Sequence, residues 1–77
     1  MVAEVVSNQR YRRVIGENIR SQRKRMGFTQ ELLAEKADLH PVYVGNVERG
    51  CENISVDSLQ RIAKALKVGL ADLVSGA

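Results

Sequence analysis

The side chains of this sequence that are best suited to catalysis are few. The 77 residues include one histidine, His40, and one cysteine, Cys51, which lie eleven positions apart. One imidazole and one thiol do not complete a metal site, which takes about four ligands. A lone histidine also supports no Ser-His-Asp arrangement, and no glycine-rich phosphate loop is present. We therefore expect no enzyme, no metal site and no bound cofactor.

The chemistry that the sequence does offer is hydrogen bonding from a short segment that follows His40. The amide of Asn46 both donates and accepts, and Arg49 is a permanent cation with several donors. Groups of these types bind the phosphates and base edges of nucleic acids. They do so with specificity only when a rigid element presents them, so the surrounding residues have to supply that element.

Residues 28–50 predict two short helices joined by a tight turn. Thr29 is a suitable N-cap for a helix over about 30–37, and Pro41 suits the first position of a second helix over 41–49. Gly50 ends the second helix, since glycine adopts a left-handed conformation without strain. Their apolar positions recur at helical spacing: Leu33, Ala34, Ala37, Val44 and Val47. Helices this short need a scaffold, and together they predict a helix-turn-helix that places one face of its second helix in the DNA major groove.

The rest of the chain predicts more helices and no sheet. We expect a first helix over Asn8–Met26, a fourth that follows an N-cap at Ser55, and a short fifth over Leu70–Val74. The apolar stripe of the first helix comprises Tyr11, Val14, Ile15 and Ile19, and that of the fourth comprises Val56, Leu59, Ile62, Ala63 and Leu66. Residues 1–10 form either an arm or an extension of the first helix. Residues 11–77 form a single domain.

Charge is distributed unevenly along the chain. Residues 1–26 carry seven basic and two acidic side chains, whereas residues 27–77 carry five basic and seven acidic ones. This asymmetry suits a polyanionic partner, although a solvated helix face explains any single basic residue equally well. Arg10, Arg12 and Arg13 either reach flanking phosphates or serve solubility. The single cysteine fits a reducing, cytoplasmic setting, and no apolar run approaches the ~18 residues of a membrane span.

Three segments in this order and spacing resemble the lambda-repressor-like, or XRE-type, helix-turn-helix family. They are IGENIRSQRKRMGFTQELLAEKADL, VYVGNVERG and NISVDSLQRIAKALKVGLADLV, which together cover nearly all of residues 15–74. The resemblance implies an all-α, compact five-helix domain that binds operator DNA as a dimer and regulates transcription. Within the family, the small restriction–modification controller proteins look most similar, on chain length and on the ERG segment.

The resemblance also implies roles for particular residues. Gln30 matches a family glutamine that contacts phosphate at the start of the second helix. The other positions that match DNA contacts are His40, Pro41, Val42, Tyr43, Asn46, Arg49 and Asn53. Pro41 and Val42 offer no hydrogen bonds and suit thymine methyls, whereas Asn46 suits adenine. Arg23 and Glu48 match a structural ion pair that ties the first helix to the third.

Two departures from the family pattern bear on structure and partners. The turn position that is often glycine is Asp38 here, and aspartate tolerates the left-handed conformation better than most residues. Leu32 stands where glutamate is common, which exposes an apolar side chain.

Two kinds of protein partner follow from these features. We expect a homodimer, with Leu70, Leu73 and Val74 as the candidate interface on the short last helix. The alternative function is an antitoxin-type protein-interaction module that also binds DNA, with Leu32 or the N-terminal arm holding the partner.

Overall fold

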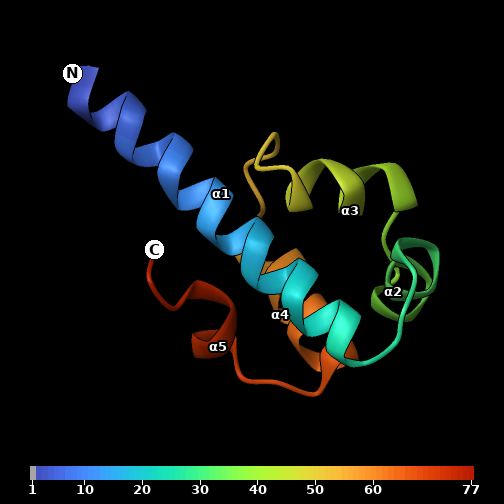
Figure 1. Ribbon diagram of the computed structural model, residues 1–77. Helices are drawn as coiled ribbons and strands as arrows, with labels where there is room; N and C mark the ends of the chain where they lie inside the picture. Colours follow the sequence, from blue (N-terminus) through green and yellow to red (C-terminus); the bar gives the residue numbers. More distant parts are fainter. Residues whose placement is uncertain (1) are drawn as a thin grey trace.

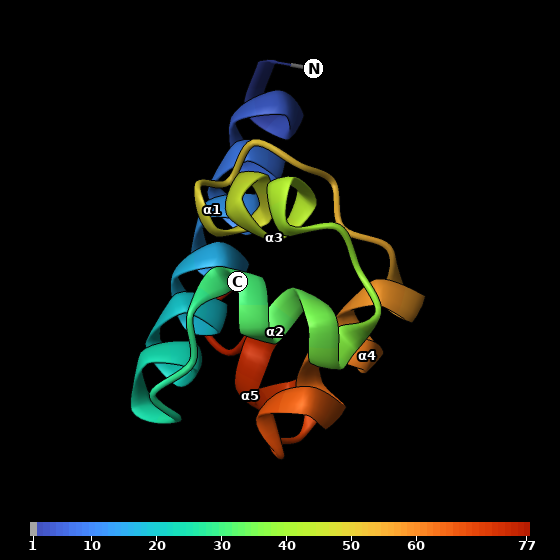
Figure 2. The ribbon, with the colours of Figure 1, turned by 90° about the vertical axis from the view of Figure 1, so that its right-hand side faces the viewer.

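The computed structural model describes residues 2–77 of the chain, with side chains from Arg10 onward. These residues form five helices and no strand, as the sequence predicts: α1 (Val2–Arg25), α2 (Gln30–Ala37), α3 (Pro41–Glu48), α4 (Val56–Leu66) and α5 (Leu70–Val74). Helix α1 runs diagonally across the molecule, with α2 and α3 on one side of it and α5 on the other (Figure 1). Seen from the side of α2, α3 lies above α2, and α4 and α5 lie lower in the view (Figure 2). No described helix is both long enough and apolar enough to cross a bilayer.

The helix ends lie where local sequence signals predict them. The Thr29 hydroxyl accepts a hydrogen bond from the Leu32 amide at 3.0 Å, and the Ser55 hydroxyl accepts one from the Ser58 amide at 3.1 Å. Asp38 ends α2 with φ +58° and Gly50 follows α3 with φ +76°. Both residues thus adopt the left-handed conformation that closes a helix C-terminus. These caps satisfy backbone groups that each short helix leaves unpaired at its ends.

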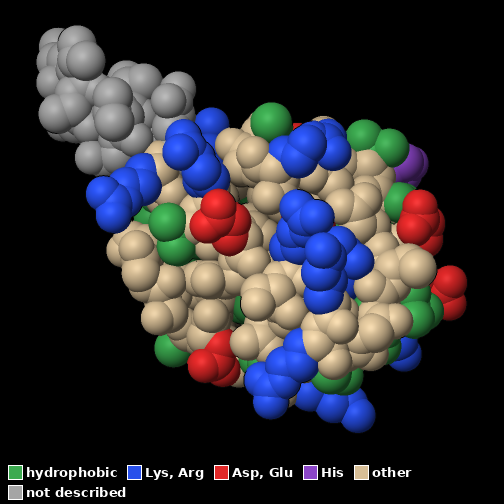
Figure 3. Space-filling model, in the orientation of Figure 1, with side chains coloured by type: hydrophobic (Ala, Val, Ile, Leu, Met, Phe, Trp, Pro, Cys, Tyr) green, Lys and Arg blue, Asp and Glu red, His purple; other side chains and the backbone are tan. Residues whose placement is uncertain are grey.

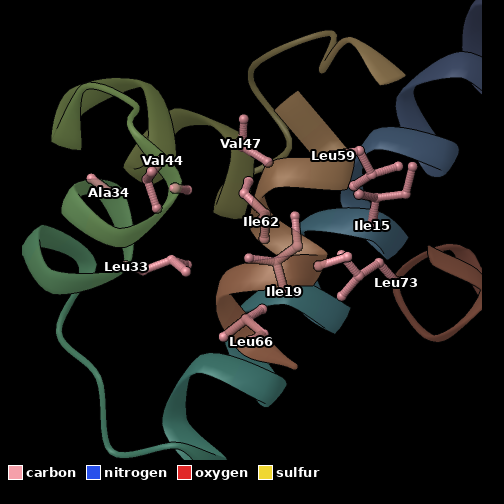
Figure 4. Close-up of a cluster of buried hydrophobic side chains, with 12 residues drawn as sticks. Ile15, Ile19, Leu33, Ala34, Val44, Val47, Leu59, Ile62, Leu66 and Leu73 are labelled. Carbon is pink, nitrogen blue, oxygen red and sulfur yellow. The ribbon is translucent and has the colours of Figure 1, made fainter. Parts of the chain in front are cut away.

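One apolar core receives side chains from every helix (Figure 4). Its buried members are Ile15, Ile19, Leu33, Ala34, Ala37, Val44, Val47, Leu59, Ile62, Ala63, Leu66 and Leu73. Burial of a large aliphatic side chain stabilises a fold by about 1.5–3 kcal/mol. Because α2, α3 and α5 are too short to persist alone, this shared core is what keeps them helical.

Helix α1 begins earlier than the sequence predicts, and two residues assigned to apolar stripes are exposed. The helix starts at Val2, whereas the pattern places its start near Asn8 and leaves residues 1–10 as either an arm or an extension of the helix. The structure has the extension from Val2 onward. Tyr11 is 47% exposed because this part of α1 extends beyond the helices that cover its C-terminal half (Figure 1). Val56 is 66% exposed because it is the first residue of α4, next to the solvent-facing loop. Helical spacing was correct in both places, but no neighbouring element covers these positions.

Gly16 of α1 packs directly against the backbone at the end of α3, a contact that the sequence pattern does not predict. A Cβ atom built on Gly16 would lie 2.3 Å from the Val47 carbonyl oxygen and 2.7 Å from that of Glu48. Any side chain there would therefore push the end of α3 away from α1. The available signal was the glycine itself, because a glycine inside a helix costs ~1 kcal/mol relative to alanine and calls for a reason.

Candidate nucleic-acid interface

Helix α3 has one face in the core and one face in solvent. Val44 and Val47 are fully or almost fully buried, and they hold the helix against α1, α2 and the rest of the core. On the opposite side, His40 and Pro41 are exposed, and Val42 is 63% exposed. An exposed apolar side chain beside a helix N-terminus is available to a partner. The start of α3 is therefore the part of the helix that a ligand can reach.

His40 forms the N-cap of α3. Its Nδ1 atom accepts a hydrogen bond from the Val42 amide at 3.1 Å, and Pro41 occupies the first position of the helix. Since Nδ1 acts as the acceptor, the neutral imidazole carries its proton on Nε2. The resemblance matches His40 to a DNA contact. In the structure one of its ring nitrogens caps the helix, and the Nε2–H group remains as a donor for a ligand.

Arg23 and Glu48 form the ion pair that the resemblance implies. Arg23 Nε donates to Glu48 Oε2 at 2.7 Å, and Nη2 donates to Oε1 at 3.0 Å. The two side chains are 11% and 3% exposed. Arg23 Nη1 also donates to the Phe28 carbonyl at 2.9 Å. This bidentate pair ties the end of α3 to α1 and to the connection that leads into α2, so it fixes the position of α3.

Gln30 belongs to the same network. Its Nε2 atom donates to Glu48 Oε1 at 3.1 Å, which links the start of α2 to the end of α3. One amide N–H bond is thereby directed at Glu48, and the second remains for another acceptor. A phosphate contact by Gln30 stays a prediction. Because Gln30 Nε2 donates to Glu48, the amide that would make such a contact is already oriented by Glu48.

A surface hollow of about 240 Å³ lies between the start of α2 and the outer face of α3. Its lining brings together four of the predicted contact residues, namely Gln30, Pro41, Val42 and Arg49. The lining also includes Glu31 and Gly45, which the sequence reading did not place among the contacts. The sequence indicated that Glu31 lies at this surface only through its position next to Gln30. A carboxylate at this place would repel a phosphate.

The remaining predicted contacts differ in how far they reach solvent. Asn46 is half-buried and Arg49 is exposed, and Arg49 Nη2 donates to Asn46 Oδ1. Asn53 is exposed in the loop between α3 and α4. Tyr43, predicted for the outer face, is half-buried and packs against the core. Only part of the Tyr43 side chain is therefore available to a ligand.

The three candidate dimer residues differ in how deeply they are buried. Leu73 is fully buried in the core of the single chain, so it has no surface left for a second copy. This removes it from the predicted interface, because α5 uses Leu73 to close the core against α1 and α4 (Figure 4). Leu70 and Val74 are half-buried and keep part of their surface in solvent. Asn18 holds this helix in place by donating to the carbonyls of Leu73 and Ser75 at 3.0 and 2.9 Å.

The face that carries α3 also carries much basic charge. Lys and Arg side chains form a band across the middle of this face, from the region of α3 down to the lower end of α1 (Figure 3). Most of the Asp and Glu side chains in this view lie to either side of the band. A polyanion that approaches this face meets the basic band between the middle of α1 and the region of α3. Among the residues that the structure describes, no group of three or more His, Cys, Asp or Glu side chains is placed to hold a metal ion.

Helix α3 is anchored in the core, is capped at its start and exposes one face of its first turn. A short helix and a tight turn precede it. This arrangement defines a helix-turn-helix DNA-binding protein. The chain belongs to the helix-turn-helix family (HTH_3), whose model matches residues 19–73. It is a DNA-binding transcriptional regulator of the XRE type and not an enzyme.

Proteins similar to this chain include several controllers. Control protein C.BamHI of Bacillus amyloliquefaciens is 39% identical over 64 residues, which cover 82% of this chain and 79% of that protein. Control protein C.SmaI of Serratia marcescens is 39% identical over 62 residues, with 80% and 74% covered. The crystal structure of the restriction–modification controller protein C.AhdI from Aeromonas hydrophila aligns with TM-score 0.79 at 35% identity, over 80% of this chain and 94% of that one.

Proposed function

We propose that this regulator acts as a homodimer on a palindromic operator, in the manner of a restriction–modification controller protein. The observation that carries the proposal is the contrast along α3, in which Val44, Val47 and Glu48 are buried while His40, Pro41 and Val42 face solvent. Similarity to C.BamHI and C.SmaI over about four fifths of the chain supports the controller assignment. Occupancy of the operator would block polymerase at some promoters and recruit it at others, including its own.

In this proposal the start of α3 enters the major groove. Val42 and Pro41 would pack against thymine methyls or sugar carbons, since neither side chain donates a hydrogen bond. Gln30 and the first turn of α2 would contact a phosphate, because a helix N-terminus carries free N–H groups and partial positive charge. Arg49 and Asn53 would contact the DNA from the far end of α3. With few hydrogen bonds to bases, part of the specificity would come from DNA shape.

Dimerisation is proposed through the exposed parts of Leu70 and Val74 on α5. A twofold axis there would set two α3 helices on one side of the dimer, and half-sites roughly 34 Å apart fit one turn of B-DNA. A chain of this size also gains stability from association, because a small domain buries a modest fraction of its surface. The symmetry of such a dimer is the reason to expect a palindromic site.

The test starts from a pool of random duplexes. Selection with the full chain, followed by footprinting on an enriched duplex, should yield an inverted repeat that binds two chains per duplex in sedimentation measurements. If the chain binds a scrambled duplex as tightly as the selected duplex at near-physiological ionic strength, sequence-specific regulation is contradicted. A single half-site that binds one chain would contradict the dimer. A small protein that co-purifies in equal amount would favour the antitoxin-type alternative.

The interface on α5 has a matched pair of variants. Leu70→Glu places a carboxylate on the proposed seam, and Ala71→Glu places one at the next, exposed position of the same helix. We expect Leu70→Glu to weaken the dimer measured by sedimentation equilibrium at least about tenfold, since burial of an unpaired charge is costly. Ala71→Glu should leave it unchanged. Equal dimer affinity for both variants would place the seam elsewhere.

A further inference from the structure

We propose that Arg49 reads a base in the major groove and selects guanine at one position of each half-site. This inference rests on the proposed function and deepens it, because it names the residue that determines part of the specificity. An arginine at the end of a recognition helix can meet either a phosphate or a base edge. The position of its guanidinium decides between the two.

The guanidinium of Arg49 lies back along α3 and not beyond its end. Arg49 follows Gly45 by four positions, so the two residues share one side of the helix. A Cβ atom built on Gly45 would be 3.4 Å from Arg49 Nη1. Arg49 also lines the hollow together with Pro41 and Val42, which belong to the first turn of α3. The cation is therefore on the face that would enter the groove.

Gly45 leaves the space that the guanidinium occupies. The three atoms nearest to a Cβ built there are side-chain atoms, two of Gln30 and one of Arg49. A long side chain at position 45 would therefore displace the arginine, whereas the backbone of α3 could stay in place. Glycine is unfavourable inside a helix relative to alanine. Room for a cation on the outer face gives this glycine a role.

Asn46 holds the guanidinium over Gly45. Arg49 Nη2 donates to Asn46 Oδ1, which uses one of the five N–H donors of the guanidinium. Nη1 lies over Gly45 and can donate to a ligand in the hollow. The oxygen of Asn46 keeps its second lone pair, so Asn46 retains an acceptor and its amide donors for a contact of its own. A tethered arginine loses less rotamer freedom when it binds, which favours a specific contact.

The base edges of the major groove favour guanine for this cation. Guanine offers two neighbouring acceptors, N7 and O6, which match two donors of a guanidinium, whereas adenine places an N6 donor beside N7. Of the α3 residues that line the hollow, Arg49 alone can hydrogen-bond a base through its side chain, since the others are Pro41, Val42 and Gly45. A good paired contact corresponds to roughly 5- to 150-fold discrimination between bases.

The test measures affinity by fluorescence anisotropy for the selected duplex and for duplexes with single base changes in both half-sites. The full wild-type chain should lose roughly 5- to 150-fold in affinity when one particular guanine becomes adenine. Arg49→Met should bind these two duplexes about equally and keep its preferences at the other positions. Gly45→Leu keeps the charge of Arg49 but fills the space of its guanidinium, so it should also lose the guanine preference.

Two further variants serve as controls. Gly45→Ala adds one methyl group at contact distance from side-chain ends, and it should keep the guanine preference. Arg25→Met removes an exposed arginine from the end of α1, and it should change the affinity for all duplexes by the same factor. Thermal unfolding checks that each variant is folded, which is expected because Arg25 and Arg49 are exposed and the Gln30 and Arg49 side chains beside Gly45 can move.

The outcomes separate this inference from the proposed function. If Arg49→Met lowers the affinity for every duplex by the same factor, Arg49 contacts phosphate, and base reading is wrong while operator binding stands. A Gly45→Leu variant with the full guanine preference would likewise contradict the position of the cation over Gly45. If the wild type enriches no sequence at all, both base reading and the proposed function are overturned.

Discussion

The α1–α3 seam and the outer face of α3 differ in burial: the seam is packed and buried, whereas the outer face is open to solvent. The seam, formed by Gly16, Arg23, Val47 and Glu48, combines backbone close approach with a buried bidentate ion pair. The outer face, formed by His40, Pro41, Val42 and Arg49, is exposed to solvent. A helix of only eight residues thus keeps its positioning contacts and its ligand-facing side chains on separate sides.

This division has a consequence for mutations. Changes in the seam should lower the free energy of unfolding, and changes on the outer face should lower DNA affinity at constant stability. A variant that violates this separation would show that the two surfaces are energetically coupled. Four substitutions test the separation, in order of decreasing expected effect.

The largest effect is expected from Glu48→Ala in the seam. Removal of one partner from a buried ion pair costs about 3–5 kcal/mol, because it leaves an uncompensated buried charge. Here Arg23 would retain only the Phe28 carbonyl. Urea denaturation should show a lower midpoint at constant slope. The double variant Arg23→Met with Glu48→Met is the control, and it should recover most of the loss. A loss below about 1 kcal/mol for Glu48→Ala would place this pair among weak surface ion pairs.

Gly16→Ala should follow, with a loss of about 1–3 kcal/mol in the free energy of unfolding. The added methyl group would overlap with the backbone oxygens of Val47 and Glu48, so α3 has to move away from α1. A melting temperature lower by roughly 4–8 °C per kcal/mol would report this change. An increase in stability, as for an ordinary glycine in a helix, would mean that the close approach relaxes at no cost.

Val42→Glu tests the outer face. The carboxylate falls in the first turn of α3, where the helix dipole favours it, so the free energy of unfolding should change by no more than about 0.5 kcal/mol. Affinity for the selected duplex should fall at least roughly tenfold, because a carboxylate on the face proposed to enter the groove would be repelled by the phosphates of the duplex. Fluorescence anisotropy measures the affinity, and Ala71→Glu on α5 is the control with the same added charge. Unchanged affinity in Val42→Glu would remove the start of α3 from the interface.

Gly45→Ala should have the smallest effect and the opposite sign. Its Cβ atom would meet only the ends of the Gln30 and Arg49 side chains at contact distance. Alanine should therefore raise the free energy of unfolding by about 0.5–1 kcal/mol through its higher helix propensity. Differential scanning calorimetry measures the gain. A loss of stability would mean that the Arg49 side chain cannot move aside. The outer side of α3 would then be as tightly packed as the α1–α3 seam.

The helices themselves were largely predictable from the sequence. The bounds of α2 and α5, and the starts of α3 and α4, match the cap residues and the apolar spacing, and the left-handed turn at Asp38 fits its residue type. These features depend on interactions within about five residues, so the local sequence carries the information. The positions of the candidate contact residues on α2 and α3 were predictable in the same way, and their contact with DNA stays a prediction.

The errors occurred where burial depends on distant elements. Tyr11 and Val56 have the helical spacing of core residues, yet no other helix covers them. Leu73 was assigned to a dimer seam and is instead a core residue, since α1 and α4 close over it. Spacing states which side of a helix is apolar, but it does not state how far along the helix its neighbours extend.

For this protein the residue order alone determined where α2, α3, α4 and α5 begin and where the turn between α2 and α3 lies, because N-caps and helix periodicity are local signals. The shared core then keeps these short helices folded. Tertiary structure alone decided the contact of Gly16 with the end of α3, the inward orientation of Gln30 by Glu48, and the seat of Arg49 on Gly45. Those features depend on the distance and angle at which helices cross or on which rotamer a long side chain adopts. Both are properties of the packed molecule as a whole.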